Sequence, residues 1–409
     1  MNILLINHNA GSNRHGMEYR PFYLARQWVR HGHRVVIVAA SFSHARQVSP
    51  QTRGSVSIEN LEGIQYIWLK TPEYHGNDYK RALNILAFVY AVFRNSSGFV
   101  RDFPADIVIG SSTYPLDIIP ARRLADKSGA KLVFEVHDLW PLSLIEVGGM
   151  SRYHPFVMLL QWAEDYAYRH ADRVISMLPK ALDYMMAHGM LPAKFAYVPN
   201  GIDVEEWESD QAPLPETHRK VVDDLQQSNR FLIGYAGAHG LANALDAVIE
   251  AADQLQSQPV TFVLVGQGPE KSRLQENAVK RGLTNVAFLP PVPKASVPAL
   301  LDAMDVLYIG LKNATIFRFG VSPNKLIDYM MAGKPIIHAI DAGNDLVAES
   351  GCGISIMPED PAAIASAVLN MSTKPASERD AMGALGKSYV LAHHDYRVLA
   401  QRFLEVVLQ

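Results

Sequence analysis

Short, unbroken apolar runs recur along the chain and alternate with longer segments of helical periodicity. In the first half, the predicted strands are Ile3–Ile6, Arg34–Ala39, Asp106–Ile109, Lys131–Val136, Val174–Ser176 and Phe195–Val198. A strand that is buried on both faces gives such an unbroken run, because both sets of side chains enter apolar layers. Helical patterns at 18–31, 118–128, 155–171 and 180–188 separate the runs. This alternation predicts βαβ units and a parallel sheet.

The alternation starts again after a break in the pattern. Behind Pro199–Asp203 lies a polar stretch, from Glu205 to Asn229, without a strand pattern. The strands predicted after it are Phe231–Tyr235, Thr261–Val265, Val286–Leu289, Val306–Ile309, Pro335–Ala339 and Gly353–Ile356. The 409 residues also exceed the roughly 250–300 residues that one core supports. We therefore predict an α/β protein with two doubly wound halves, 1–203 and 204–391, and a helix at about 392–409 that packs back on the first half.

Composition excludes several classes of protein and site. Hydrophobic residues make up 48% and charged residues 19%, which excludes a mostly disordered chain. The net charge of -3 argues against a nucleic-acid partner. A single cysteine, Cys352, excludes an intrachain disulfide and a multi-cysteine metal site. Neither H-E-x-x-H nor G-x-x-x-x-G-K-[ST] nor G-x-S-x-G occurs, so we expect no structural metal, no P-loop and no hydrolase elbow.

The segment Ser322-Pro-Asn-Lys-Leu-Ile-Asp-Tyr-Met330 is the most informative in the second half. We expect Ser322 to be the N-cap and Pro323 the first helical residue, with free N–H groups around Asn324 that form an anion site. Lys325 adds a positive charge in the same turn, and Asp328 follows three residues later on the same face. This combination suits a diphosphate and the vicinal hydroxyls of a ribose. A capped helix with an ordinary Lys–Asp ion pair is the alternative.

Two glycine-bearing loops follow predicted strands in the same half. The first is Gly234-Tyr-Ala-Gly237-Ala-His239-Gly240, and the second begins with Gly266-Gln-Gly268-Pro269. Small residues at such places allow the backbone to approach a ligand closely, so we assign Gly237, His239, Gly266 and Gly268 to the same binding site. A tight turn between a strand and a helix explains these residues equally well.

In the first half, His137 and Asp138 follow the strand 131–136. Because ligands of doubly wound sheets bind beyond the carboxyl ends of strands, both residues are candidate catalytic groups. A histidine there moves a proton or orients a sugar hydroxyl, and a buried histidine bonded to its own loop is the alternative. The loop after the first strand offers candidates for binding an acceptor or a phosphate, namely Asn9, Gly11, Gly16 and Glu18.

Two stretches combine aromatic and basic residues. Residues 81–101 mix large apolar side chains with arginines, and residues 153–162 are amphipathic. They suit a membrane surface or, alternatively, the packing of core helices. The apolar run Leu83–Phe93 is too short to span a bilayer, and residues 1–7 lack the features of a signal peptide. We expect a cytoplasmic protein that associates peripherally with the inner face of the membrane.

Taken together, these motifs resemble the family 4 glycosyltransferases. The resemblance rests on the glycine-bearing loop after the first strand, on His137-Asp138, on Val198-Pro-Asn-Gly-Ile-Asp203, on 266–269 and on 324–336. It implies the GT-B fold, in which two Rossmann-like domains face each other across a cleft. It also implies transfer of a sugar from a nucleotide-sugar bound by the second half, generally with retention and without a cofactor or a tightly bound metal. The leaving diphosphate would help to deprotonate the acceptor, and His137 would position the sugar.

The sequence departs from the family pattern at the donor site. The family spaces two acids eight positions apart, whereas here Asp328 is preceded by Gly320. The Arg and Lys that the family usually carries after the first strand of this half are absent from Gly237–Asn243. We infer that Lys325 takes over their contact with the diphosphate.

The segments Glu135–Pro141 and Ser322–Met330 look most like a bacterial subgroup that builds O-antigen, capsule and related lipopolysaccharide units, including N-acetyl-L-fucosamine transferases. This implies a UDP-sugar donor and a lipid-linked saccharide acceptor at the inner membrane surface. Two alternatives remain at this point. One is an enzyme related to the UDP-N-acetylglucosamine 2-epimerases, which share the fold, and the other is a non-catalytic protein that binds sugar nucleotides.

Overall fold

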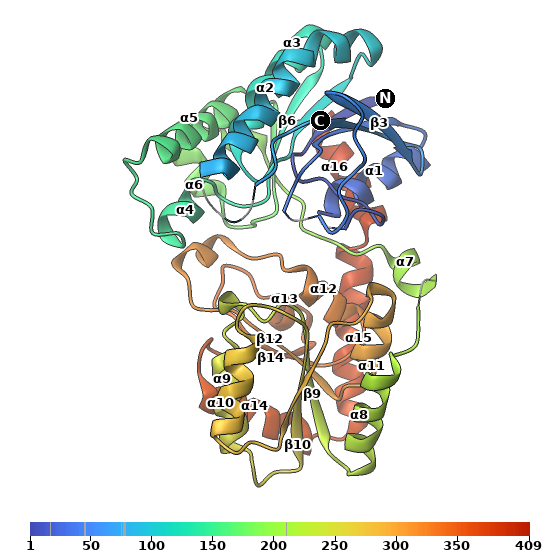
Figure 1. Cartoon of the computed structure of the whole chain (residues 1–409), viewed down its shortest axis with the longest axis vertical. Helices are drawn as coiled ribbons and strands as arrows, with labels where there is room; N and C mark the ends of the chain where they lie inside the picture. Colours follow the sequence, from blue (N-terminus) through green and yellow to red (C-terminus); the bar gives the residue numbers. More distant parts are fainter. Residues whose placement is uncertain (17, 45, 75, 77–78, 210) are drawn as a thin grey trace. The chain divides into compact units, whose positions relative to one another are not determined.

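The computed structural model describes residues 1–16, 18–44, 46–74, 76, 79–209 and 211–409 (Figure 1). Contacts divide the chain into two compact units. Unit 1 consists of Met1–Asn200 and Tyr396–Gln409, and unit 2 consists of Gly201–Asp395. The sequence analysis placed these boundaries at residues 203 and 391. Each unit contains a mostly or wholly parallel sheet with helices on both faces, which confirms the predicted α/β, doubly wound class.

The sheet of unit 1 has eight strands in the order β3-β4-β2-β1-β5-β6-β7-β8. Their bounds are β1 Asn2–Ile6, β2 Arg34–Ala40, β3 Val56–Leu61, β4 Ile64–Leu69, β5 Ile107–Gly110, β6 Lys131–Val136, β7 Arg173–Ser176 and β8 Phe195–Tyr197. All neighbouring pairs are parallel except the antiparallel pair β3–β4. The register places Leu4 beside Val36 on one side and Val108 on the other.

The hairpin of β3 and β4 is absent from the sequence analysis. Strand β3 is only half-buried and reads as a polar segment, so it lacks the apolar run used to find the other strands. The turn residues Glu62 and Gly63 both have positive φ, 50° and 82°, which is the geometry of a two-residue hairpin turn. In the sequence, the Glu-Gly pair followed by the apolar run Ile64–Leu69 was the signal that could have predicted this hairpin.

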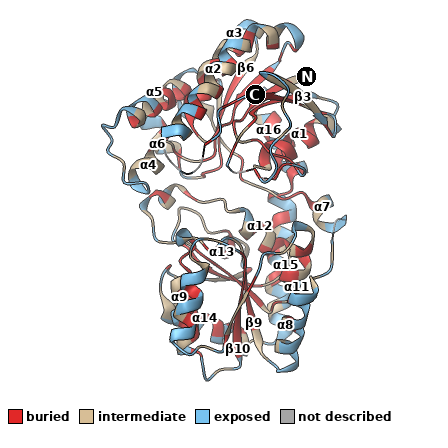
Figure 2. Ribbon diagram, in the orientation of Figure 1, coloured by how far each residue is buried: buried red, intermediate tan, exposed pale blue. Residues whose placement is uncertain are grey.

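The helices of unit 1 cover both faces of its sheet. They are α1 Arg20–Arg30, α2 Tyr79–Asp102, α3 Ile118–Ser128, α4 Leu142–Glu146, α5 Pro155–His170, α6 Leu182–Ala187 and α16 Tyr396–Leu408. Ile3 and Leu5 point into one apolar layer together with α1 and α16, and the alternate residues Leu4 and Ile6 are also buried. Figure 2 shows the buried strands inside the helical layers. Burial on both faces explains the unbroken apolar runs.

Helix α2 is longer than the run Leu83–Phe93 suggested. By length and composition alone it is able to cross a membrane, with an 18-residue window of mean hydropathy 1.2, of which 33% is buried. A core helix of a globular protein meets the same criteria. Here Ile85, Phe88 and Val92 are buried, and Arg123 of α3 donates to Ser96 of α2 at 2.8 Å. In the fold, α2 therefore packs as a layer helix of unit 1.

The sheet of unit 2 has six parallel strands in the order β11-β10-β9-β12-β13-β14. The bounds are β9 Phe231–Ala236, β10 Val260–Val265, β11 Val286–Leu289, β12 Val306–Gly310, β13 Ile336–Ala339 and β14 Gly353–Ser355. The helices are α7 Val204–Ser209, α8 Glu216–Gln227, α9 Leu245–Gln254, α10 Lys271–Lys280, α11 Val297–Asp302, α12 Asn324–Met331, α13 Leu346–Ser350, α14 Pro361–Thr373 and α15 Ala376–His393. The polar stretch after residue 203 thus contains two helices, α7 and α8, that are polar because most of their residues are not buried.

Candidate functional site

In unit 2, the segment 322–330 forms helix α12 with a different start from the one expected. The helix begins at Asn324, and its N-cap is Pro323 in an extended conformation with φ -73° and ψ 125°. The expectation that Ser322 is the N-cap and Pro323 the first helical residue is therefore wrong by one position. Proline has no side chain that accepts a hydrogen bond, so the N-cap residue itself leaves the first N–H groups of the helix without a side-chain cap. Ser322 is half-buried and Asn324 exposed.

Lys325 does not form the ion pair with Asp328 that the alternative interpretation requires. Its ammonium group donates to the Tyr235 hydroxyl at 3.1 Å and to the side-chain oxygen of Asn243. It also lies 4.9 Å from the centre of the Tyr235 ring. All these partners are neutral, and burial lowers the pKa of Lys325 to about 8. At neutral pH the structure thus presents a largely protonated lysine with no acidic partner among the described residues.

Asp328 lies one turn further along α12 and is half-buried. No hydrogen bond or ion pair joins its carboxylate to another described residue. Burial raises its pKa to about 7, although the charge of Lys294 acts in the opposite direction. A carboxylate without partners is able to accept hydrogen bonds from a diol.

Tyr329 and Gly237 bring the glycine-bearing loop after β9 to this lysine. The Tyr329 hydroxyl accepts from the N–H of Ala236 at 2.7 Å, so α12 is fixed to the end of β9. A Cβ atom added to Gly237 would lie 3.5 Å from the Lys325 ammonium nitrogen and 3.3 Å from the Tyr235 hydroxyl. The structure therefore brings Gly237 and Lys325 together, as expected for two parts of one site.

For Gly266 and Gly268, the structure gives a different reason for glycine than close approach to a ligand. A Cβ atom on Gly266 would lie 1.8 Å from the carbonyl oxygen of Gly237, and one on Gly268 would lie 2.4 Å from that of His239. The loops after β9 and β10 therefore pack backbone against backbone, and glycine is needed for that contact.

His239, which the sequence assigned to the binding site, is fully buried. Neither of its ring nitrogens has a hydrogen-bond partner among the described residues. Burial, together with the charges of Lys271 and Lys325, lowers its pKa to about 4, so the ring is neutral. A neutral histidine with free nitrogens beside two lysines leaves the positive charge of the region to those lysines.

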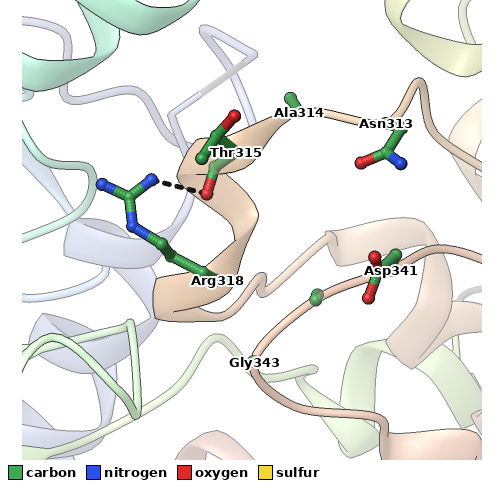
Figure 3. Close-up of a pocket in the computed structure, with 7 residues that line it drawn as sticks. Asn313, Ala314, Thr315, Arg318, Asp341 and Gly343 are labelled. Carbon is green, nitrogen blue, oxygen red and sulfur yellow. Dashed lines mark hydrogen bonds between the residues drawn. The ribbon is translucent and has the colours of Figure 1, made fainter.

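A pocket of about 460 Å³ lies in unit 2 beyond the carboxyl ends of β12 and β13 (Figure 3). Asn313, Thr315, Arg318, Asp341 and Gly343 are among its lining residues. The guanidinium of Arg318 donates to the Thr315 carbonyl at 2.6 Å. The pocket is small and polar and offers both signs of charge, which suits a group rich in hydroxyls.

Gly320, which stands where the family has its first acid, adopts φ 104°. Residues with a side chain rarely adopt this conformation, so an acid at this position would be strained. The backbone at this position thus favours glycine over an acid, and Asp341 is the carboxylate among the residues that line the neighbouring pocket.

In unit 1, His137 lies between two carboxylates. Its Nδ1 is 3.2 Å from Glu18 Oε1, and its Nε2 is 3.3 Å from Glu135 Oε2. The Ser111 hydroxyl is 3.0 Å from Nε2 and donates to Glu135. Burial lowers the pKa of His137, but the hydrogen bonds and charges of the two acids outweigh it and raise the pKa to about 9. His137 is therefore a buried imidazolium, whose two nitrogens both donate.

Arg20 and Glu135 also belong to the His137 network, which was not predicted from the sequence. Arg20 Nε donates to Glu135 Oε1 at 2.9 Å, and both side chains are buried. Arg20 also donates to the carbonyls of Val198 and Pro199. An acid within the apolar strand 131–136 was the available signal, because a buried carboxylate requires a partner.

Asp138 bonds to its own loop, and no hydrogen bond joins its carboxylate to His137 among the described residues. Its carboxylate accepts from the Leu139 N–H at 2.9 Å, and burial raises its pKa. Asp138 thus orders the turn that follows β6, while its carboxylate stays close enough for the charge of His137 to act on it.

The loop after β1 folds back onto Glu18. The Glu18 N–H donates to the Asn9 carbonyl at 3.4 Å, and the Gly11 N–H donates to the Glu18 carbonyl at 2.9 Å. Gly16 adopts φ 85°, which favours glycine, and packs against Gln47. The Glu18 side chain is 30% exposed, so the charged network reaches the surface of unit 1 there.

Comparisons with known proteins agree with this architecture. Residues 15–201 match the Glycosyl transferase 4-like domain, and residues 230–374 match Glycosyl transferases group 1. WcaI of Escherichia coli (strain K12), named as a glycosyl transferase of colanic acid biosynthesis, is 25% identical over 335 residues, 80% of this chain and 81% of that protein.

Two solved structures show the same fold. Sucrose-phosphate synthase from Thermosynechococcus elongatus superposes with a TM-score of 0.75 at 15% identity, over 99% of this chain and 98% of that one. Anabaena Alr3699/HepE in complex with UDP and glucose superposes with a TM-score of 0.67 at 16% identity. The match covers 100% of this chain and 99% of that one. The two family matches span most of the chain, one in each unit, and the chain therefore belongs to the glycosyltransferases that combine a 4-like first domain with a group 1 second domain.

Proposed function

We propose that the protein transfers a sugar from a UDP-sugar to a lipid-linked saccharide acceptor in the biosynthesis of a bacterial surface polysaccharide, such as O-antigen or capsule. The proposed donor sugar is an N-acetylated deoxyhexosamine such as N-acetyl-L-fucosamine. The observation that carries the proposal is Lys325, a half-buried cation beside Gly237 whose partners among the described residues are all neutral. WcaI is named for polysaccharide biosynthesis, and HepE was solved with UDP and glucose, which supports this choice of reaction class and nucleotide.

In unit 2, the donor site proposed here follows α12 from its N-terminus. Lys325 and the first N–H groups of the helix hold the diphosphate, because both are positive and no described acid competes for the lysine. Asp328, one turn on, accepts hydrogen bonds from the ribose hydroxyls. The pocket beside Arg318 and Asp341 takes the sugar, whose hydroxyl and acetamido groups match its mixed polar lining.

In unit 1, His137 is proposed to position the sugar and to stabilise, by its positive charge, the negative charge that develops in the reaction. As an imidazolium it has no lone pair with which to accept a proton, so it is not the base that deprotonates the acceptor. In the proposed reaction, the acceptor oxygen bonds to the anomeric carbon while the bond from that carbon to the UDP oxygen breaks. The hydroxyl proton passes to the departing diphosphate, and the configuration is retained. Glu18 is placed to bind acceptor hydroxyls, since its side chain reaches the surface.

A lipid-linked acceptor requires a surface that approaches a membrane, and unit 1 offers one. On α2, one helical stripe is exposed although it is apolar; it consists of Tyr79, Leu83, Leu86, Tyr90 and Phe93. Met158 and Trp162 of α5 are also exposed, and α2 and α5 share a buried cluster through Ile85 and Leu160. Arg94 is exposed and adds positive charge on α2, whereas Arg101 is paired with Asp102. We propose that this stripe docks on anionic lipid at the cytoplasmic face of the inner membrane.

The donor is tested by calorimetry of the purified protein with UDP, GDP and a panel of UDP-sugars, with EDTA present. The proposal predicts binding of UDP, strengthened by a UDP-linked N-acetylated deoxyhexosamine. Lys325→Ala should weaken UDP binding by about 10- to 100-fold, the range for a charge-assisted contact. Lys280→Ala, at the end of α10, is the matched control. Equal binding of UDP to both variants would refute the role of Lys325.

The membrane surface is tested separately by flotation with vesicles that contain phosphatidylglycerol. The wild-type chain should float with these vesicles and much less with vesicles of neutral lipid. Leu83→Glu and Tyr90→Glu should reduce flotation. Val279→Glu is the control, because Val279 is an exposed apolar residue of unit 2. Unchanged flotation of the two α2 variants would exclude this docking surface.

A further inference from the structure

A second cluster of charged side chains lies in unit 1, outside the His137 network. Glu164 and Asp165 are neighbours on α5, and His188 follows α6 directly as its C-cap. One ligand atom from each lies within 4.8 Å of the others. We propose that Glu164, Asp165 and His188 bind a divalent transition-metal ion of the Zn²⁺ type that ties α5 to the end of α6. This contradicts the expectation from sequence that the protein has no structural metal.

Glu164 is a buried acid without a cationic partner among the described residues. Its side chain is 1% exposed, yet no lysine or arginine among the described residues pairs with it. Its partners are neutral: the Tyr168 hydroxyl at 3.0 Å, the Tyr184 hydroxyl at 2.8 Å and the Gln161 amide at 3.0 Å. A buried carboxylate is costly without a compensating charge, which a metal ion would supply.

Gln161, Asp165 and His188 form a triangle of close contacts that no single assignment of hydrogen atoms satisfies. Gln161 Nε2 is 2.8 Å from Asp165 Oδ1 and 2.9 Å from His188 Nδ1, and these two atoms are 2.9 Å apart. If His188 Nδ1 carries a proton, it faces another donor in Gln161; if it does not, it faces another acceptor in Asp165. Exchanging the amide oxygen and nitrogen of Gln161 places oxygen against oxygen instead. One side of the triangle is thus unfavourable in each state with an ionised Asp165.

A cation at the position of the Gln161 amide group removes this conflict. Asp165, Glu164 and His188 would then all direct lone pairs to it, and the amide oxygen of Gln161 or a water would complete four ligands. One imidazole with two carboxylates suits Zn²⁺ and related ions, whereas Mg²⁺ prefers oxygen ligands and retained waters. Tyr168 and Tyr184 would orient the Glu164 carboxylate, as outer partners of metal ligands do.

The test uses the full-length chain without a polyhistidine tag, after dialysis against EDTA. Calorimetry should show one Zn²⁺ bound per chain, and saturating Zn²⁺ should raise the midpoint of thermal unfolding by about 5 °C. Mg²⁺ should produce neither effect. Co²⁺, used as a second probe, should give visible absorption bands that Zn²⁺ abolishes by competition.

Three variants make the result specific. Asp165→Asn and His188→Ala should each weaken Zn²⁺ binding at least tenfold and abolish the thermal shift; both side chains are about 30% exposed, so the fold should tolerate the changes. His393→Gln, which removes an exposed histidine of α15, should leave binding unchanged. Absence of Zn²⁺ binding in the wild-type chain, or equal binding in all three variants, would overturn the proposal.

Discussion

Lys325 is half-buried and His137 is buried, yet their pKa values move in opposite directions. Burial disfavours the charged form of each group. Lys325 has only neutral partners, so burial prevails and its pKa falls to about 8. His137 is bonded by Glu18 and Glu135, whose negative charges outweigh burial and raise its pKa to about 9. The lysine is therefore available to an external anion, whereas the charge of the histidine is already compensated within unit 1.

The first prediction concerns the pH dependence of UDP binding. Because only protonated Lys325 attracts the diphosphate, and its pKa is about 8, affinity should fall by about tenfold between pH 7 and pH 9. Lys325→Arg should remove most of this dependence, since arginine stays charged over that range. Calorimetry at a series of pH values measures both proteins. The same ligand is used with each, so ionisation of UDP itself cancels; parallel pH profiles would count against Lys325 as the contact.

The second prediction concerns the charge of His137. Glu135→Gln removes one of its two carboxylates and should lower its pKa by about one to three pH units. Nuclear magnetic resonance of ¹⁵N-histidine-labelled protein measures this directly. Asp117 and Asp138 also lie close enough to stabilise the imidazolium, and Arg20 supports it indirectly, because its charge keeps Glu135 ionised. Asp183→Asn, on α6, is the control. An unchanged His137 titration in Glu135→Gln would show that Glu135 does not hold the proton.

The same shifts give the sign of the pH effect on stability. The folded pKa of His137, about 9, exceeds the ordinary value of 6.5, so its contribution is complete below pH 6.5 and is lost as the pH rises through 9. The folded pKa of Glu135, about 2, lies below 4.5, so its contribution is present above pH 4.5 and is lost as the pH falls through 2. The network should therefore stabilise unit 1 most between pH 4.5 and 6.5.

At the scale of elements, the C-terminal helix α16 completes the core of unit 1. The Trp28 indole on α1 donates to the Ala400 carbonyl at 3.0 Å, and its ring meets that of Phe403 edge to face at 5.2 Å. Tyr23 stacks on Tyr396. The last residues of the chain therefore fill a layer that the first 200 residues leave incomplete.

The third prediction follows from this packing. Phe403→Ala removes a fully buried ring and should lower the free energy of unfolding of unit 1 by about 3–5 kcal/mol. Chemical denaturation, followed by the fluorescence of the tryptophans, measures the change. Leu408→Ala is the control on the same helix, because Leu408 is 53% exposed and should cost at most about 0.5 kcal/mol. Equal effects of the two substitutions would refute a core role for α16.

At the scale of the whole molecule, the chain passes between the units twice. It leaves unit 1 after Asn200 and returns at Tyr396. Within unit 2 the two passages run side by side, since the Ile202 N–H donates to the His394 carbonyl at 2.8 Å and Ile202 pairs with Asp395. Within unit 1, Arg20 holds the carbonyls of Val198 and Pro199. The first passage is thus fixed to the same arginine that pairs with Glu135.

The fourth prediction assigns nucleotide binding to one unit. Saturating UDP should slow amide hydrogen exchange in residues 235–243 and 322–329 of the full-length chain, because binding stabilises the segments that hold the ligand. Mass spectrometry of peptides locates the effect. Lys325→Ala at the same UDP concentration should show much less protection. Protection confined to unit 1 would contradict the proposed donor site.

The sequence predicted most of the sheets because both are buried on two faces. Runs such as Ile3–Ile6 and Val306–Ile309 are apolar throughout and need no partner to be identified as strands. Strand β3 was not predicted because it is half-buried at the edge of the sheet. Its pairing with β4, and not its own composition, makes it a strand. Helices α7 and α8 were not predicted because few of their residues are buried, so they lack an apolar helical pattern.

For the candidate sites, local spacing in the sequence predicted chemical roles for His137, Lys325 and Asp328. It did not determine what each of them contacts. Arg20 and Glu135 are 115 residues apart, and Asp165 and His188 are 23 apart, so their pairing depends on how strands and helices pack. Charge state depends on burial and on neighbours brought together by that packing. Only the tertiary structure therefore decided that His137 is an imidazolium and that Lys325 has no acid beside it in the described part of the chain.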